Sequence, residues 1–389
     1  MTDSPSSVVP PTSATAAAAK KPAAKKKERK WAPRMWIGMC YGTWTLFLIR
    51  NRFQVSFCYW YKAVLITLVS FLNTAQWLVE SLILGPAIRR TKIQPRPLII
   101  LGHWRSGTTW LHELLGLDPQ FTSPSTYQVM APNHFTISHW WVTRVFYWLM
   151  PSRRPMDNMP MGWDRPQEDE FALCNLGIPS PYLTIAFPNR PPAYQEYLTL
   201  DVSEAERTRW KNALYHFLQK VTFLTGKRLI IKSPTHTARV RTLLEMFPDA
   251  RFIYIVRDPY VLFPSTVHLW KRLYETHGLQ VPTFAGLEEH VLSTFTRIYD
   301  RFEADRALIP PERLYEVRYE DLVADARGRM EEIYRQLELG DYSQVRPAIE
   351  KYLAENADYQ TNKYSLTDEQ RAAVRTRWRP FIEKYGYGS

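Results

Sequence analysis

A short apolar run that leads into a glycine-bounded loop constrains the fold of this chain more than any other feature. Residues 97–101 (PLIIL) have the pattern of a buried strand, and residues 102–107 form a loop before a helix expected to begin near Thr109. This arrangement directs backbone N–H groups and a helix N-terminus at one place, which creates a site for an anion. The sequence therefore predicts an anionic ligand directly after this strand.

The loop differs from the phosphate loop of nucleotide triphosphatases at one position. Gly102 and Gly107 have the G-x-x-x-x-G spacing, but Thr108 stands where those proteins have Lys, and the cation is Arg105, inside the loop. A loop with an internal cation followed by Ser-Gly-Thr-Thr resembles the 5′-phosphosulfate loop of the sulfotransferases, whose donor is 3′-phosphoadenosine 5′-phosphosulfate (PAPS). The resemblance implies donor contacts at Arg105, Ser106, Gly107, Thr108, Thr109 and Trp110.

A second segment carries the same resemblance. Residues 250–256 are rich in β-branched and aromatic side chains, and Arg257 follows at the end of this expected strand. Ser265 comes eight residues later, on a helix that Pro259 opens. An Arg and a hydroxyl at these places can converge on one phosphate. In the sulfotransferase family the same pair holds the 3′-phosphate of the donor, which implies this role for Arg257 and Ser265.

Two later segments extend the resemblance towards the nucleoside. Residues 317–322 resemble the late strand of the family in which a Tyr lies near the adenine, and this implies a contact by Tyr319; the alternative is a core Tyr at a strand end. Residues 362–365 offer hydroxyls and a cation, Lys363, that could close over the 3′-phosphate.

Strand-like and helical runs alternate after Pro95. The strand-like runs are 98–102, 229–232, 252–256 and 314–318, and helical patterns follow at 109–116, 237–247, 260–276 and 331–337. This alternation predicts an α/β fold, with a parallel sheet flanked by helices and ligands bound at the carboxyl ends of the strands. We expect residues 95–389 to form a sulfotransferase catalytic domain of the P-loop-like fold. The aromatic, Pro-rich insertion 122–194, which shows little periodicity, should form the acceptor side of its cleft.

Sulfonate transfer needs in-line attack and compensation of the charge on the leaving oxygen. Arg105 is placed to stabilise that charge without donating a proton, since Arg hardly loses its own. Because a sulfonate carries less charge than a terminal phosphate, and no Asp/Glu cluster accompanies the loop, we expect no metal. The product of the donor would be adenosine 3′,5′-bisphosphate.

Three residues compete for the role of general base. His236, in the segment 231–236 (IKSPTH), has a side chain suited to proton transfer near neutral pH. Soluble small-molecule sulfotransferases carry a similar Lys-Thr-His, which implies active-site roles for Lys232 and His236. The rivals are Glu168 and Glu170 in the insertion, and a solvated acidic turn with a structural His is also open.

Residues 1–94 suggest an association with a membrane. Residues 1–34 carry eight Lys/Arg and two Asp/Glu, supply half of the net charge of +12, and should be a disordered polybasic tail. Residues 35–94 form an apolar and aromatic helical segment, in which 63–85 is long enough to span a bilayer. Because Asn73, Gln76 and Glu80 interrupt it, we favour an interfacial anchor over a span or plain core helices.

The remaining observations concern compartment and partners. Cys40, Cys58 and Cys174 cannot form a disulfide framework, and no Asn-x-Ser/Thr acceptor occurs, which favours the cytoplasm, at the cytoplasmic face of a membrane. We expect a small-molecule or lipid acceptor, a membrane surface, and no specific nucleic acid. The alternative functions are a P-loop kinase, which lacks its Lys, and an inactive nucleotide-binding scaffold.

Overall fold

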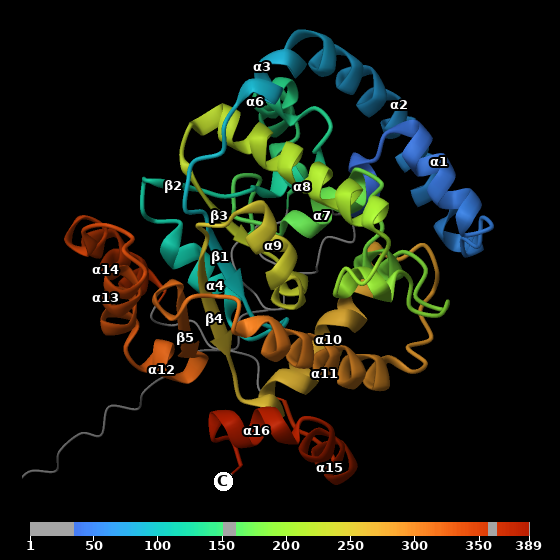
Figure 1. The fold of residues 1–389 in the computed structure, drawn as a ribbon. Helices are drawn as coiled ribbons and strands as arrows, with labels where there is room; N and C mark the ends of the chain where they lie inside the picture. Colours follow the sequence, from blue (N-terminus) through green and yellow to red (C-terminus); the bar gives the residue numbers. More distant parts are fainter. Residues whose placement is uncertain (1–34, 151–160, 357–363, 389) are drawn as a thin grey trace, which may run out of the picture. The chain divides into compact units, whose positions relative to one another are not determined.

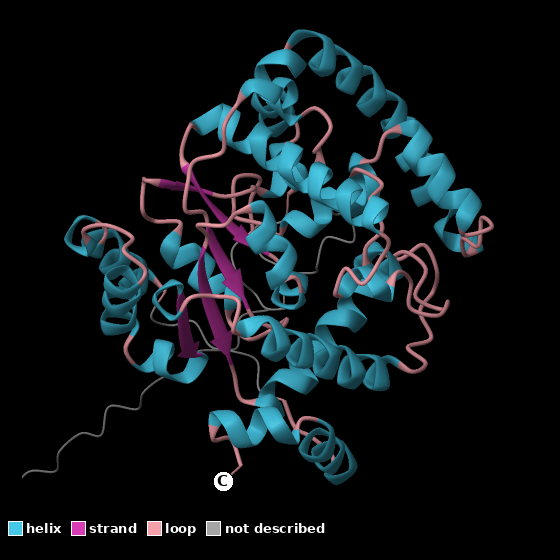
Figure 2. Cartoon of the chain, viewed as in Figure 1, coloured by secondary structure: helices cyan, strands magenta, loops and turns pink. Residues whose placement is uncertain are grey.

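A sheet of five parallel strands lies at the centre of the computed structural model, which describes residues 35–150, 161–356 and 364–388. The strand order is β2-β3-β1-β4-β5, so the first strand of the chain is central (Figures 1 and 2). The strands are β1 (Leu98–Leu101), β2 (Phe121–Thr122), β3 (Arg228–Lys232), β4 (Arg251–Val256) and β5 (Leu314–Arg318).

Helices occupy most of the remaining described chain. Those before and beside the first strands are α1 (Tyr41–Arg50), α2 (Trp60–Ile83), α3 (Gly85–Arg90), α4 (Thr108–Leu115), α5 (Thr126–Met130), α6 (Phe135–Val145), α7 (Asp169–Asn175), α8 (Glu204–Thr225) and α9 (Val240–Met246). Those that follow are α10 (Pro259–His277), α11 (Leu287–Arg306), α12 (Tyr319–Ala324), α13 (Ala326–Gln336), α14 (Arg346–Glu355), α15 (Asp368–Arg377) and α16 (Arg379–Tyr385).

Short 3-10 helices connect several of these elements. They are η1 (Met35–Gly38), η2 (Phe57–Tyr59), η3 (Tyr147–Leu149), η4 (Pro181–Ile185), η5 (Gln195–Leu198), η6 (Pro234–Ala238), η7 (Pro311–Arg313) and η8 (Tyr342–Gln344).

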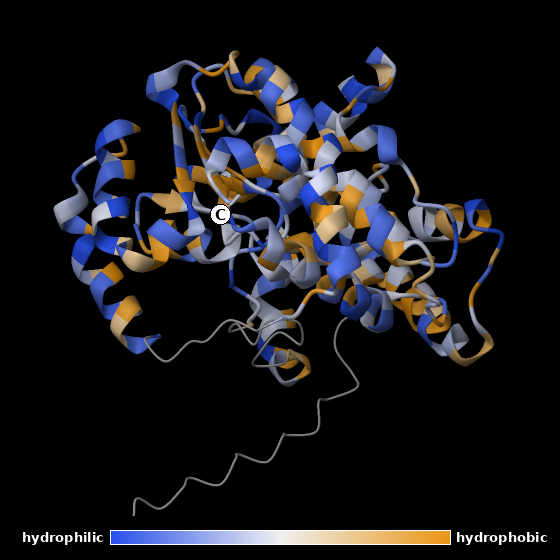
Figure 3. Ribbon diagram, turned by 90° about the horizontal axis from the view of Figure 1, so that it is seen from below, coloured by the Kyte–Doolittle hydropathy of each residue, from blue (hydrophilic) through white to orange (hydrophobic). Residues whose placement is uncertain are grey.

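Both faces of the sheet are buried, and each has its own core. Leu98 and Ile100 of β1 pack with α4, α12, α13 and α14, whereas Ile99 and Leu101 pack with α8 to α11 and the N-terminal helices. The alternation follows from the two-residue period of a strand. A sheet covered on both faces favours strands that are apolar throughout, which explains the continuous apolar run of β1. Figure 3 colours each residue of the ribbon by its hydropathy, with apolar residues in orange.

The structure confirms the predicted parallel sheet flanked by helices, with differences in detail. The four predicted strands are present, and β2 is an additional short edge strand. The predicted helix 237–247 is divided into η6 and α9, because Arg239 between them leaves the helical conformation (φ −126°, ψ 20°). The insertion 122–194 contains α5, α6 and α7 despite its weak periodicity.

The N-terminal helices share the core of the sheet. Trp36 of η1 and Trp44 of α1 are fully buried, and they belong to the same hydrophobic cluster as β1 and β4. Trp44 Nε1 donates to Thr67 Oγ1 (2.8 Å), which joins α1 to α2. Residues 35–94 therefore pack directly against the predicted catalytic domain.

Candidate active site

The loop after β1 is wound tightly enough to present its backbone to a ligand. Gly102, Arg105 and Gly107 have φ values of +148°, +72° and +103°. A Cβ on Gly107 would collide with the ring of Tyr319, so this position requires glycine. Arg105 adopts the left-handed conformation that non-glycine residues rarely take, and such strain is concentrated at functional sites. The loop thus has the backbone geometry of an anion site at the N-terminus of α4.

Arg105 contacts the residues predicted to hold the 3′-phosphate. Its Nε donates to Ser265 Oγ of α10 (2.9 Å), and its carbonyl oxygen accepts a hydrogen bond from Arg257 Nη1 (2.9 Å). The Arg257 guanidinium stacks over the Tyr319 ring, 4.2 Å from its centroid, and the Trp110 ring meets Tyr319 edge-on. The structure therefore brings together these five predicted residues from the ends of β1 and β4 and from α4, α10 and α12.

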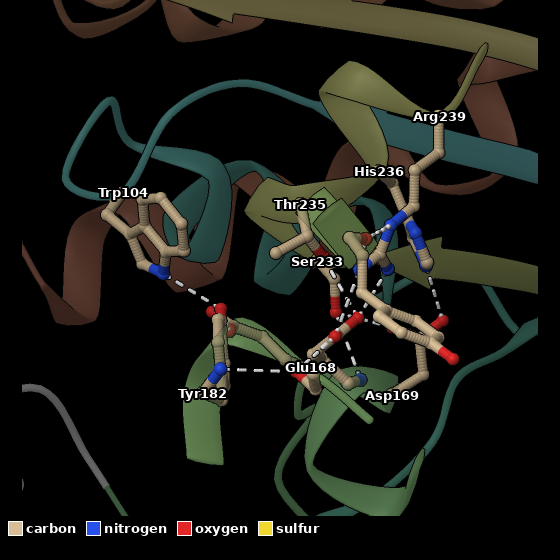
Figure 4. A network of polar contacts seen from close by, with 11 residues as sticks. Trp104, Glu168, Asp169, Tyr182, Ser233, Thr235, His236 and Arg239 are labelled. Carbon is tan, nitrogen blue, oxygen red and sulfur yellow. Dashed lines mark hydrogen bonds and ion pairs between the residues drawn. The ribbon is translucent and has the colours of Figure 1, made fainter. Parts of the chain in front are cut away.

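A chain of hydrogen bonds leaves this loop and returns to it. Lys232 Nζ, at the end of β3, lies 3.4 Å from Thr109 Oγ1 and 3.0 Å from Glu168 Oε1. Tyr182 donates its hydroxyl to Glu168 Oε2 (2.6 Å), and Trp104 Nε1 donates to the Tyr182 oxygen (2.8 Å; Figure 4). Both ends of the chain, Thr109 and Trp104, flank the loop's cation in sequence. Of the two predicted acids, Glu168 is consequently the one that these contacts connect to the loop after β1.

The environment of Tyr182 keeps it a donor. Burial, followed by the nearby Glu168 carboxylate, raises the pKa of Tyr182 well above its ordinary value. Its hydroxyl therefore keeps its proton and can hold one oxygen of Glu168, while Lys232 holds the other. Two donors of this kind fix the orientation of the carboxylate beside the loop.

His236 is fully buried away from this chain of contacts. Its Nε2 lies 2.8 Å from Asp169 Oδ2, and Ser233 donates to the other oxygen of the same carboxylate (Figure 4). The Trp210 ring packs edge-on against the imidazole. Burial alone would raise the pKa of Asp169, but the attraction of His236 and these hydrogen bonds outweigh it and lower the pKa.

Glu170 is also fully buried, in an ion pair with Arg239. The guanidinium contacts both carboxylate oxygens through Nη1 and Nη2, and it donates further hydrogen bonds to the Tyr197 carbonyl (3.1 and 2.8 Å). Thr235 Oγ1 donates to Glu170 as well (3.0 Å). Burial opposes ionisation of Glu170, yet Arg239 reverses this effect and lowers its pKa. This carboxylate is therefore committed to holding α7 against η5 and η6.

Two contacts in this site could not be assigned from sequence. The only signal for Trp104 is its place beside Arg105, and Tyr182 lies in the insertion 122–194 without a motif. Lys363 and the polybasic residues 1–34 lie outside the described residues. Within the described ranges, no group of three His, Cys, Asp or Glu side chains has the arrangement of a metal site.

Comparison with known proteins gives a consistent result. The model of the sulfotransferase family matches residues 97–344. Over 360 residues the chain is 48% identical to the omega-hydroxy-beta-dihydromenaquinone-9 sulfotransferases Stf3 of Mycobacterium bovis and Mycobacterium tuberculosis, and 92% of this chain and 92% of each relative are covered.

Solved structures share the fold. Sulfotransferase STF9 from Mycobacterium avium superposes with a TM-score of 0.64 at 20% identity, covering 89% of this chain and 96% of that chain. Sulfotransferase STF1 from Mycobacterium tuberculosis gives 0.57 at 19% identity, covering 87% and 92%. At this level of identity the two structures are evidence for the fold alone.

Proposed function

This chain belongs to the sulfotransferase family and is an enzyme that transfers a sulfonate group to a hydroxyl; we propose that its donor is PAPS and its acceptor an amphipathic, lipid-like alcohol. The observation that carries the proposal is the contact of Arg105 with Ser265 and Arg257 around a strained loop. It gathers two cations and the N-terminus of α4 at the carboxyl end of the sheet.

The residues present fit the donor. Backbone N–H groups of the loop, together with Arg105, suit the 5′-phosphosulfate, because they form an anion site with a cation inside it. Arg257 and Ser265 suit the 3′-phosphate, and the aromatic rings of Trp110 and Tyr319 suit a purine. PAPS, when bound, supplies the sulfonate that is transferred.

The chain's own residues would then perform three tasks. Arg105 stabilises the negative charge that develops on the leaving phosphate oxygen. Lys232, held between Thr109 and Glu168, offsets charge at the loop side of the cleft. Glu168 accepts the proton of the acceptor hydroxyl as the new S–O bond forms.

Glu168 is the general base in this proposal because of its position. His236 and Glu170, the other two candidates, are fully buried and are paired with Asp169 and Arg239 respectively. Moving either to the loop would leave a buried charged partner behind, which costs several kcal/mol (~3–5). Glu168 pays no such penalty, since its partner Lys232 already lies beside Thr109.

The names of the relatives support the proposed acceptor. The two mycobacterial relatives are named for a hydroxylated dihydromenaquinone, and the identity of 48% extends over nearly the whole of both chains. We extend this chemistry to the present chain and propose a hydroxylated, menaquinone-like lipid as its acceptor. The enzyme would meet this lipid at the cytoplasmic face of a membrane.

Ligand binding followed by transfer tests the proposal. In calorimetry with EDTA present, adenosine 3′,5′-bisphosphate should bind at least about tenfold more tightly than adenosine 5′-monophosphate, since only the former engages Arg257 and Ser265. Radiolabelled sulfonate from PAPS should then appear in the organic extract when a hydroxylated menaquinone is supplied. Equal binding of the two nucleotides would contradict the donor assignment, and labelled product only with water-soluble alcohols would contradict the acceptor.

A further inference from the structure

Helix α2 has the reverse of the pattern expected for a surface helix in water. Its exposed side chains are all apolar or aromatic, and Leu72 and Leu82 expose 63% and 80% of their surface. In a water-soluble protein the outward face of such a helix carries charged and polar residues. The exposed residues of α2 are Trp60, Tyr61, Val64, Leu68, Phe71, Leu72, Ala75, Trp77, Leu78, Val79, Leu82 and Ile83.

The charged residues of α2 point into the protein. Lys62 donates to the Gly278 carbonyl (3.0 Å) and lies over the Tyr59 ring. Glu80 forms a buried ion pair with Lys220 and accepts from the Thr136 backbone N–H (3.0 Å). Both acid and base are thus withdrawn from the outer surface, which is left without charge.

The inner face of α2 is fixed to the protein along most of its length. Asn73, which lies between Lys62 and Glu80 in the sequence, donates to the carbonyls of Ile37 and Met39 (2.6 and 3.1 Å) and accepts from the His134 ring (3.0 Å). The segment 57–83 is long and apolar enough to cross a membrane. Crossing would, however, expose these buried polar groups to hydrocarbon, so the contacts favour a helix that lies flat.

Helix α1 extends the same outer surface. The rings of Tyr41 and Phe71 stack with their centroids 4.2 Å apart, which places the two helices side by side along the periphery (Figure 1). Leu46 and Ile49 of α1 and Phe57 of η2 are exposed as well. We call the exposed apolar residues of α1, η2 and α2 the apolar ridge.

Basic residues flank the ridge, and acidic ones are excluded from it. Arg50, the last residue of α1, and Arg52 are exposed, and Arg89, Arg90 and Lys92 are exposed after α2. Glu80 is the only acidic residue in the sequence from 35 to 94, and it is buried. Residues 1–34, with eight Lys/Arg and two Asp/Glu, lead into η1, which packs against α2.

We propose that the apolar ridge is a monotopic docking surface that lies in the headgroup–acyl boundary of an anionic bilayer. The apolar side chains enter the boundary, and the flanking cations meet anionic headgroups. Lipid fits better than a second copy of the chain, because two copies of one ridge would bring like charges together, whereas an anionic surface complements them. This inference goes beyond the transfer reaction and does not depend on the identity of the donor or the acceptor.

Flotation with acceptor-free vesicles tests the docking surface. The full chain is mixed with vesicles of phosphatidylglycerol and phosphatidylcholine, alongside the variant Leu72→Glu/Leu78→Glu. Because each exposed leucine loses its burial in the bilayer, the variant should partition at least about a hundredfold less. The matched control Leu224→Glu/Leu308→Glu, which replaces two leucines exposed elsewhere, should float like the wild type.

Two further measurements separate the alternatives. Both variants should keep the wild-type thermal unfolding and bind adenosine 3′,5′-bisphosphate equally, because the substituted side chains are exposed. The wild type should stay on vesicles at high salt, since the apolar contact is not screened. Wild-type flotation of Leu72→Glu/Leu78→Glu would overturn the proposal. The proposal would also be overturned if light scattering showed a dimer for the wild type and a monomer for Leu72→Glu/Leu78→Glu, while neither protein floated with the vesicles.

Discussion

Glu168 and Glu170 are two residues apart in one segment, and both form ion pairs, but they lie in different surroundings. Glu168 lies beside the loop that follows β1, held by Lys232 and Tyr182, whereas Glu170 is fully buried in the core with Arg239. Glu168 precedes the first turn of α7 with extended backbone, and Glu170 lies within that turn, so the two side chains point in different directions. The same type of side chain can therefore lie beside the loop at one position and be paired within the core two residues later.

The largest expected effect is the loss of stability when Glu170 loses its partner Arg239. Arg239→Met should lower the free energy of unfolding by about 3–5 kcal/mol, because it leaves Glu170 as an unpaired buried charge. Urea denaturation measures the change. The control Arg379→Met removes an exposed pair with Glu383 and should cost less than about 0.5 kcal/mol. A wild-type urea midpoint for Arg239→Met would show that the ion pair of Arg239 with Glu170 is not required for stability.

Substitution of Arg105, in the loop after β1, should instead lower the rate of transfer and leave the stability nearly unchanged. Arg105→Ala should reduce kcat by about 10²–10³, since the charge that Arg105 offsets develops mainly in the transition state. Arg105→Lys should retain more activity, and both variants should unfold at nearly the wild-type urea concentration. Native turnover by Arg105→Ala would show that the loop cation has no catalytic role.

The connection between the loop and Glu168 can be probed through Tyr182. Tyr182→Phe deletes the donor to Glu168 and the acceptor for Trp104. The loss of such bonds costs about 1–3 kcal/mol, which we expect to appear as a kcat lower by about tenfold with donor affinity unchanged. Should affinity for adenosine 3′,5′-bisphosphate fall instead while kcat stays constant, Tyr182 would support the loop and not the base.

The most gradual effect concerns the buried network beneath α2, because it is spread over a range of pH. Burial, and secondarily Lys220, lowers the pKa of His134 to about 4. The unfolded chain therefore binds a proton first on acidification, so this residue's contribution is complete above about pH 6.5 and is lost as the pH falls towards 4. Stability measured by urea should decline across that window, and His134→Gln should flatten the decline by up to about 1.4 kcal/mol per pH unit. If His134→Gln and the wild type showed the same dependence of stability on pH, a residue other than His134 would be responsible for it.

The parts of this molecule that could be predicted from sequence are those fixed by local pattern. The residue types of β1 and β4 indicate buried strands, and the glycines of the loop after β1 indicate a tight turn. Strand β2 carries no such signal because it has two residues. The predicted helix is divided at Arg239, whose ion-pair partner Glu170 is distant in the sequence, so no local pattern contains that contact.

The sequence could not decide among the candidate bases either, because the deciding contacts are made by residues that are distant in the chain. Which carboxylate faces the loop depends on contacts with Lys232, His236 and Arg239, which lie more than sixty residues away in the chain. The polar residues of α2 were visible as a poor fit to a lipid-exposed span. Their partners, His134 and Lys220, emerge only when α6 and α8 are packed against that helix.

The role proposed for Glu168 is tested most directly by the single-turnover rate of sulfonate transfer by Glu168→Gln, with saturating PAPS and a hydroxylated menaquinone. The rate should be about 10²–10⁴ below the wild type, since the acceptor proton loses its base. Affinity for adenosine 3′,5′-bisphosphate should stay near the wild-type value, whereas the urea midpoint should fall, because the buried Lys232 loses its ion-pair partner. A wild-type rate for Glu168→Gln would contradict the assignment of Glu168 as the general base. If a stably folded His236→Gln then showed a rate about 10²–10⁴ below the wild type, His236 would be the base instead.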